Sequence, residues 1–305
     1  MLYDCLIIGG GIAGLQGAIQ LGRYNHKVLV IDANDGRSTL CQSYHNVLGY
    51  PDGVSGPELR DVGRKHAEGL GVAFAAARAV AVKRTSNGFK VETDGAESYE
   101  ARRLLLSTGI VDRIPPFPEL HPCLGISVYV CPDCDGYEVS NRKTVVIGSG
   151  DPGANMALTL SYWTKRIVFI NHEQKKVDEE LLSKLKAKAI EVIDRPIKRV
   201  LADGSDFRGV EMDNGEVIEA ERGFVAFGGN EVRSQLARQL GVELHENKHI
   251  LVDPRTKMTN VEHVWAAGDI VAHSEQVTIA MGDGSHAAIW IHKTLLEEQE
   301  KSRGQ

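Results

Sequence analysis

The sequence has little of several features, and each shortage excludes a class of protein. No apolar run reaches the 18 or more residues that a membrane-spanning helix needs. The 5 cysteines are an odd number and too few for a secreted disulfide framework. Positive charge is not in excess, since 35 Lys and Arg face 41 Asp and Glu, and a nucleic-acid binder would show a basic stripe. The sequence therefore predicts a protein that binds neither a membrane nor a nucleic acid.

What is present points to an ordinary folded chain. Hydrophobic residues make up 42% of the sequence and charged residues 25%, which is close to the average of globular domains. At 305 residues, two domains are a better expectation than one. Near the N-terminus, Asp4 and several glycines argue against a secretory signal, so we expect a cytoplasmic protein.

A glycine-rich motif follows the first apolar segment. Leu6–Ile8 has the composition of a buried strand, residues 13–22 are compatible with a helix, and a second strand at 28–31 ends at Asp32. Glycines at such positions allow a tight turn and a close approach to a pyrophosphate, which the N–H groups of the helix then face. The acid follows the last motif glycine at about the spacing at which a carboxylate binds an adenosine ribose. The motif predicts a dinucleotide site formed by Gly9, Gly11, Ile12, Ala13, Gly14 and Asp32.

The same pattern occurs a second time. The apolar segment 144–147 precedes Gly148, Gly150 and Gly153, and a helix-like segment and another strand lead to position 171. Here Asn171 replaces the acid. The duplication indicates either one tightly held cofactor and one exchangeable one, or one working site and one relic.

Two further strand-and-turn segments resemble parts of the first unit. Residues 104–107 lead into Thr108 and Gly109, and residues 264–267 lead into Gly268 and Asp269. Three prolines between 115 and 118 have the composition of a linker. We therefore expect an α/β protein with two Rossmann-like three-layer domains, the second inserted into the first. The expected ranges are 1–114 and 245–305 for the first domain and 118–240 for the second.

One cysteine pair has the spacing needed for redox chemistry. Cys131 and Cys134 form a C-x-x-C that can cycle between dithiol and disulfide, and Asp135 is placed to exchange a proton with sulfur. A zinc site with His121 and Cys123 is an alternative, although its ligands would be crowded and no other metal-ligand spacing stands out. Two purely structural thiols are a second alternative.

Together these segments resemble the low-molecular-weight thioredoxin reductase family of class II pyridine nucleotide-disulfide oxidoreductases. The resemblance rests on residues 9–14, 45–59, 107–109, 131–136, 148–153 and 266–269 with Gln276, and so covers nearly the whole chain. It implies FAD on the first domain, a nucleotide-type second domain that carries the cysteines, a homodimer, and two domains that rotate relative to each other.

The resemblance also assigns roles. It implies that Cys134 lies against the flavin, that Cys131 attacks the substrate disulfide and that Asp135 is the general acid and base. For FAD it implies Asp32 at the ribose and Asp269 at the ribityl chain. It further implies that FAD is contacted by Asn46, Arg37, Thr108, Gly109, Gly268, Gln276 and Val277.

The second domain departs from the NADPH-using members. They carry an arginine-rich run after the second strand, where this chain has Asn171, and Lys175 and Lys176 remain as point charges for a phosphate. The case for NADPH as the electron donor is therefore weaker, although NADPH is not excluded, and NADH is not favoured. A ferredoxin-type protein is a third possible donor.

Three functions stay open on the sequence. The first is reduction of a thioredoxin-like protein disulfide or a small disulfide. The second is a dithiol oxidase with oxygen as acceptor, because the interior of the motif, Pro132 and Asp133, and Tyr137 after it resemble the gliotoxin- and holomycin-type enzymes. The third is a flavin-bound redox sensor that turns over nothing.

Overall fold

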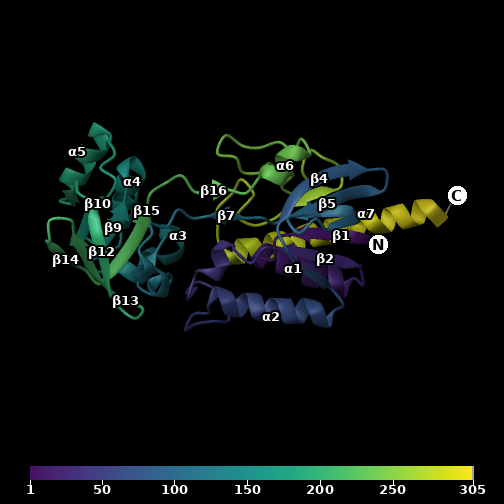
Figure 1. Ribbon diagram of the computed structural model, residues 1–305, viewed down its shortest axis with the longest axis horizontal. Helices are drawn as coiled ribbons and strands as arrows, with labels where there is room; N and C mark the ends of the chain where they lie inside the picture. Colours follow the sequence, from purple (N-terminus) through teal and green to yellow (C-terminus); the bar gives the residue numbers. More distant parts are fainter. Residues whose placement is uncertain (304–305) are drawn as a thin grey trace. The chain divides into compact units, whose positions relative to one another are not determined.

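The computed structural model describes residues 1–303, which divide into two compact units. The first unit comprises residues 1–39, 57–111 and 231 onward, and the second comprises 40–56 and 112–230. Figure 1 shows the elements of each unit. Both are Rossmann-like, so the expected fold class is confirmed.

The first unit is built on a seven-stranded sheet. Its parallel part has β1 (Leu2–Ile8) between β2 (Val28–Asp32) and β6 (Ser98–Leu106), with β3 (Ala73–Ala76) beyond β2 and β17 (Val264–Ala266) against the end of β6. β4 (Ala79–Thr85) and β5 (Gly88–Thr93) continue from β6 in antiparallel pairing. The short strands β7 (Ile110–Val111) and β16 (Glu231–Val232) pair where the chain leaves and re-enters this unit.

Alternation along the strands divides the core of the first unit into two layers. Cys5 and Ile7 on β1 face one layer, together with α1 (Ile12–Arg23) and α7 (Val277–Arg303). Leu6 and Ile8 face the other, where α6 (Gln235–Gln239) packs. α2 (Gly56–Gly69) is the third long helix, and η1 (Arg37–Thr39) is a short 3₁₀ turn.

The two main helices of this unit pack very closely. A Cβ on Gly284 of α7 would lie 2.2 Å from the Ala13 carbonyl oxygen of α1, a distance that no side chain tolerates. This contact fixes the first turn of α1, which carries the first glycine motif, against α7.

The second unit has a five-stranded parallel sheet, in the order β11 (Glu191–Ile193), β10 (Ile167–Asn171), β9 (Thr144–Gly148), β15 (Arg222–Ala226) and β8 (Val128–Tyr129). α4 (Gly150–Leu160) and α5 (Glu179–Ala187) cover one face. The antiparallel strands β12 (Ile197–Asp203), β13 (Asp206–Met212) and β14 (Val217–Glu219) cover the other. η2 (Pro118–Cys123), α3 (Pro132–Asp135) and η3 (Gly136–Val139) complete the unit.

The observed unit boundaries differ from the expected ranges. Residues 40–56 belong to the second unit because the Gln42 N–H donates to the Leu124 carbonyl at 2.9 Å, and Gly125 packs against Cys41 and Ser43. Residues 231–240 belong to the first unit, where Gln239 Nε2 donates to the Val80 carbonyl at 3.1 Å. The observed divisions thus lie before the expected ones at 114 and 240, and neither contact leaves a local sequence signal.

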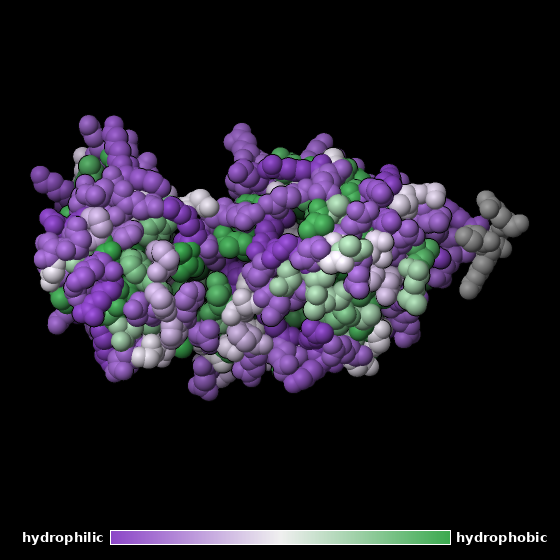
Figure 2. Space-filling view, viewed as in Figure 1, coloured by the Kyte–Doolittle hydropathy of each residue, from purple (hydrophilic) through white to green (hydrophobic). Residues whose placement is uncertain are grey.

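Hydrophilic residues cover most of the face shown in Figure 2, and apolar residues appear in smaller areas. Within residues 1–303, no helix is long and apolar enough to cross a membrane.

Candidate functional site

The first glycine-rich turn joins β1 to α1. Gly9 has φ +104°, and a Cβ on Gly14 would lie 1.9 Å from the Gly9 carbonyl oxygen. Both positions therefore require glycine. Gly11 is the N-cap residue of α1, no acidic side chain occurs in the first turn, and nothing lies within 4 Å of where a Cβ on Gly11 would be. The space beside Gly11 at the helix N-terminus is thus open, which suits a pyrophosphate there.

Asp32 lies beside this turn, as the sequence indicated. Its Oδ1 accepts a hydrogen bond from the Gly10 N–H at 3.1 Å. Its Oδ2 accepts from Arg60 Nη2 at 2.7 Å, in an ion pair whose two side chains are mostly buried. The carboxylate is therefore held in one orientation at the carboxyl end of β2.

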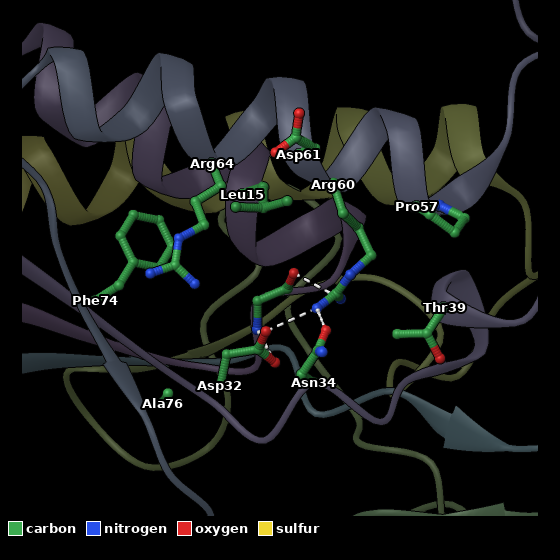
Figure 3. Close-up of a pocket in the computed structure, with 11 residues that line it drawn as sticks. Leu15, Asp32, Asn34, Thr39, Pro57, Arg60, Asp61, Arg64, Phe74 and Ala76 are labelled. Carbon is green, nitrogen blue, oxygen red and sulfur yellow. Dashed lines mark hydrogen bonds and ion pairs between the residues drawn. The ribbon is translucent and has the colours of Figure 1, made fainter.

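Arg60 is a residue of this site that the sequence did not reveal. It comes from α2, and it also donates to the Gly10 carbonyl and to Asn34 Oδ1, both at 2.8 Å. Figure 3 shows the guanidinium reaching down from the helix between these acceptors. Arg60 thus ties α2 to the glycine turn and to the end of β2.

A cavity of about 450 Å³ opens at this point. It is bounded by Asp32 and Arg60, and on the far side by Arg64, whose guanidinium lies 4.7 Å from the centre of the Phe74 ring. A flat aromatic ring, carboxylate oxygens and two guanidinium groups around one cavity are suited to a nucleoside with attached phosphate.

Except for Asn46, the remaining residues expected at the first site lie in the same unit. Arg37 Nη1 donates to Asp269 at 3.0 Å and to Glu275 at 2.7 Å. Thr108 Oγ1 donates to the Arg233 carbonyl at 2.7 Å, and the next residue, Gly109, has φ +64°. Val277 begins α7, directly after Gln276. Asn46 is exposed in the second unit and is absent from these contacts, so its role stays a prediction.

A buried acid that the sequence did not single out supports the turn at Gly268. Asp283 of α7 is 5% exposed, and its Oδ2 accepts from the Gly268 N–H at 3.1 Å and from His273 Nε2 at 2.6 Å. Lys257 pairs with the other oxygen at 2.7 Å. The hydrogen bond to Asp283 raises the pKa of His273. This network holds the turn that presents Asp269.

The second glycine-rich turn has the same backbone plan and different surroundings. Gly148, Gly150 and Gly153 lie between β9 and α4, and Asn171 ends β10. Asn171 is 3% exposed and its Oδ1 accepts from the Gly150 N–H at 2.8 Å. Lys175 and Lys176 approach Gly150, within 3.4 Å of where its Cβ would be. The structure places these residues together around one turn, while their nucleotide role stays a prediction.

The two cysteines bracket a single turn of helix. Cys131 is the N-cap residue of α3 and Cys134 lies within it, with Pro132 at the first helical position, where its missing N–H costs nothing. The N–H groups of Cys134 and Asp135 donate to the Cys131 carbonyl at 3.3 and 3.0 Å. Both cysteines are partly exposed. The backbone thus keeps the two sulfurs on one short, accessible segment.

Asp135 ends this turn in an environment that favours its protonated form. Burial raises the pKa of its carboxyl to about 7, and the nearby negative charge of Glu138 adds to the effect. Gly136 follows directly and packs on the indole of Trp163, since a Cβ there would lie 2.5 Å from the ring. A carboxyl with such a pKa can both give and take a proton near neutral pH.

Cys123, which the zinc alternative requires, is buried in the second unit, and its thiol donates to the Glu119 carbonyl at 3.3 Å. Within the described part of the chain, no three His, Cys, Asp or Glu side chains are placed to hold a metal ion together.

Two Rossmann-like units with a C-x-x-C in the second define a class of flavoprotein disulfide oxidoreductase, and comparison with known proteins agrees. The family model for pyridine nucleotide-disulphide oxidoreductases matches residues 3–284, so the chain belongs to that family. Membership implies FAD.

Individual relatives are similar along their whole length. Thioredoxin reductase from Mycolicibacterium smegmatis is 29% identical over 97% of this chain and 98% of its own. Among solved structures, putative thioredoxin reductase TrxB from Bacillus anthracis has a TM-score of 0.83 at 26% identity, with 97% and 99% of the two chains covered. HlmI has a TM-score of 0.86 at 28% identity, with 99% and 95% of the two chains covered. This match supports the resemblance to the gliotoxin- and holomycin-type enzymes.

Proposed function

We propose that this protein is an FAD-dependent dithiol-disulfide oxidoreductase that passes electrons through Cys134 and Cys131 to a protein disulfide of the thioredoxin type. The observation that carries the proposal is the pair of partly exposed cysteines on α3, followed by a carboxyl whose pKa lies near 7. Full-length similarity to thioredoxin reductases supports the substrate class.

The residues around the first glycine turn fit FAD. The open N-terminus of α1 suits its pyrophosphate, and Asp32 suits the adenosine ribose. Asp269, supported through the Gly268 turn, suits the ribityl chain. When bound, FAD supplies the two electrons that open a disulfide between Cys131 and Cys134.

Reduction of the substrate then takes two thiol-disulfide exchange steps. The Cys131 thiolate attacks the substrate disulfide, and one substrate thiolate leaves with a proton from Asp135. The Cys134 thiolate next attacks the Cys131 sulfur, closes the internal disulfide and releases the second substrate thiolate. Each cysteine passes its thiol proton to Asp135 before it attacks, and Asp135 passes one proton to each substrate thiolate that leaves. The substrate thus gains two electrons and two protons, and the Cys131 and Cys134 dithiol loses them.

Anaerobic reductive titration of the FAD-loaded protein tests this proposal. Four electron equivalents are expected, two for the flavin and two for the cysteine pair, and Cys134→Ser should reduce the total to two. Cys5→Ser is the matched control, because Cys5 is fully buried in the first unit, and it should keep all four. Uptake of two equivalents by the parent protein would refute a redox role for the pair.

A second candidate is a dithiol oxidase, and the likeness to HlmI favours it. In that case a small dithiol reduces the Cys131 and Cys134 disulfide and oxygen accepts the electrons from the flavin. Mixing the aerobic protein with a dithiol should then release hydrogen peroxide in step with thiol loss. A reductase would instead reduce a thioredoxin disulfide once its flavin is reduced, and would release no peroxide in step with thiols.

The donor, a homodimer and a cytoplasmic location stay predictions. NADPH and a reduced ferredoxin-type protein are the two donors to compare with the thioredoxin disulfide as acceptor.

A further inference from the structure

The second glycine turn is occupied by side chains of its own unit. Besides accepting from Gly150, Asn171 uses its Nδ2 to donate to the Lys175 carbonyl at 2.7 Å and to Asp194 Oδ1 at 2.8 Å. The residue at the position of Asp32 thus spends its acceptor and both N–H groups within the protein. A ribose would find no counterpart of the Asp32 carboxylate here.

A different carboxylate, that of Glu173, lies beside this turn, next to Ser149. Glu173, two residues after Asn171, is held by both Nη atoms of Arg113, at 3.2 Å for the longer contact, and by Lys175 Nζ at 2.8 Å. The Ser149 side chain at the N-terminus of α4 is a further neighbour of this carboxylate. These contacts, led by the one to Arg113, lower the pKa of Glu173 to about 2, so it is charged at any physiological pH.

The ion pairs span the carboxyl ends of the central strands, where a Rossmann domain receives its dinucleotide. Glu173 follows β10 and Ser149 follows β9. The guanidinium of Arg113 lies 5.4 Å from the ring of Phe227, the residue after β15. Figure 1 shows these three strands side by side, next to α4.

We propose that Glu173 excludes NADPH from the second domain by taking the position and the charge of a dinucleotide phosphate. Glu173 holds the two cations, Arg113 and Lys175, that a phosphate would otherwise use. It also adds a negative charge that repels the phosphates of any incoming nucleotide. The inference concerns the donor in the proposed function, because a chain with this site receives its electrons without a nicotinamide bound in the second domain.

Calorimetric titration of the FAD-loaded protein with NADPH tests the proposal. The parent protein should bind with a dissociation constant above about 1 mM. Glu173→Gln keeps the shape of the side chain and frees both cations, so its affinity should rise about ten- to hundredfold, as expected for new hydrogen bonds to a charged group. The matched control is Glu180→Gln, which removes an exposed, lysine-paired acid in the same unit and should leave the affinity unchanged.

A second variant distinguishes the effect of the Glu173 charge from the effect of removing a side chain that covers the site. Arg113→Ala removes half of the ion-pair network and keeps the Glu173 charge, so it should gain no affinity. Tight NADPH binding by the parent protein, no gain in Glu173→Gln, or an equal gain in Glu180→Gln or Arg113→Ala would each overturn the proposal. Circular dichroism and flavin content confirm that each variant is folded.

The readout is binding and requires no turnover. The proposed function fails separately, in the count of electron equivalents, so the two failures are distinguishable.

Discussion

The two glycine-rich turns share a strand, a turn and a helix, yet their surroundings differ in charge and openness. At the first, Gly11 faces open space and Asp32 is held by a residue from another helix, Arg60. At the second, Asn171 and residues 175–176 lie against Gly150, and the Glu173 carboxylate is a neighbour of the Ser149 side chain at the helix N-terminus. The glycine pattern preserves a backbone, and under the proposed exclusion of NADPH the residues after the second strand decide whether a nucleotide can bind there.

In the proposed function the second unit carries the thiol chemistry instead. Its α3 turn holds the cysteine pair and the raised carboxyl of Asp135. We therefore expect mutations in the first unit to act on flavin affinity and mutations in the second to act on thiol chemistry or stability.

The largest effect is expected for Asp135→Asn. Loss of the proton donor should slow thioredoxin reduction about 10²- to 10⁴-fold, the range for general acid and base catalysis, and remove the inflection near pH 7 from the rate profile. Stopped-flow measurement of disulfide reduction by the prereduced protein checks it. Asp133→Asn, which changes an exposed acid in the same motif, is the control. An unchanged pH profile in Asp135→Asn would contradict the assignment.

The same substitution should stabilise the protein at alkaline pH. Because the pKa of Asp135 is about 7 when folded and 3.8 ordinarily, the folded state binds more protons than the unfolded state between these values. Stability therefore falls as the pH rises through this window, and the loss is complete above it. Asp135→Asn removes the penalty, worth up to about 4 kcal/mol of unfolding free energy.

Thermal melts of the reduced protein at pH 5 and pH 8 measure this effect. The advantage of Asp135→Asn over the parent should be larger at pH 8. An equal difference at both pH values would show that burial of the charged carboxyl is not its cause.

The paired substitutions Asp32→Ala and Asn171→Ala test the comparison directly. Asp32→Ala removes charged hydrogen bonds to the ribose and should weaken FAD binding about ten- to hundredfold. Asn171→Ala leaves the Gly150 N–H and Asp194 without their partner and should cost about 1 to 3 kcal/mol of stability, with FAD affinity unchanged. Flavin fluorescence titration of the apoprotein and urea unfolding measure the two effects. Equal losses of FAD affinity would mean that both turns serve the flavin.

Much of this contrast could be predicted from the sequence. The turns, Asp32 and Asn171 follow from local patterns, because a glycine motif between a strand and a helix fixes its own geometry. The C-x-x-C with Asp135 is equally local. The resemblance extended these patterns to Asp269 and to a second domain inserted in the first.

The features of the two turns that could not be predicted depend on contacts between segments that are distant in the sequence. Arg60 lies 28 residues from Asp32, and Arg113 lies 60 residues from Glu173. Each looks in the sequence like an ordinary surface charge, and only the packing of α2 and the crossing near β7 bring it to a glycine turn. The raised pKa of Asp135 likewise depends on burial, which no motif reports.

The smallest effect is expected for Arg60→Met, which tests how much the ion pair between Arg60 and Asp32 contributes to the first turn. Without Arg60, the Asp32 carboxylate and the Gly10 carbonyl lose a common donor, and FAD affinity should fall about tenfold. Arg60→Lys keeps the positive charge without the forked guanidinium group, and its FAD affinity should lie between those of the parent and Arg60→Met. Lys65→Met, an exposed lysine on the same helix, should bind FAD as the parent does. If Arg60→Lys and Arg60→Met weaken binding equally, the fork geometry carries the effect, and if neither does, Arg60 has no part in holding Asp32 for the flavin.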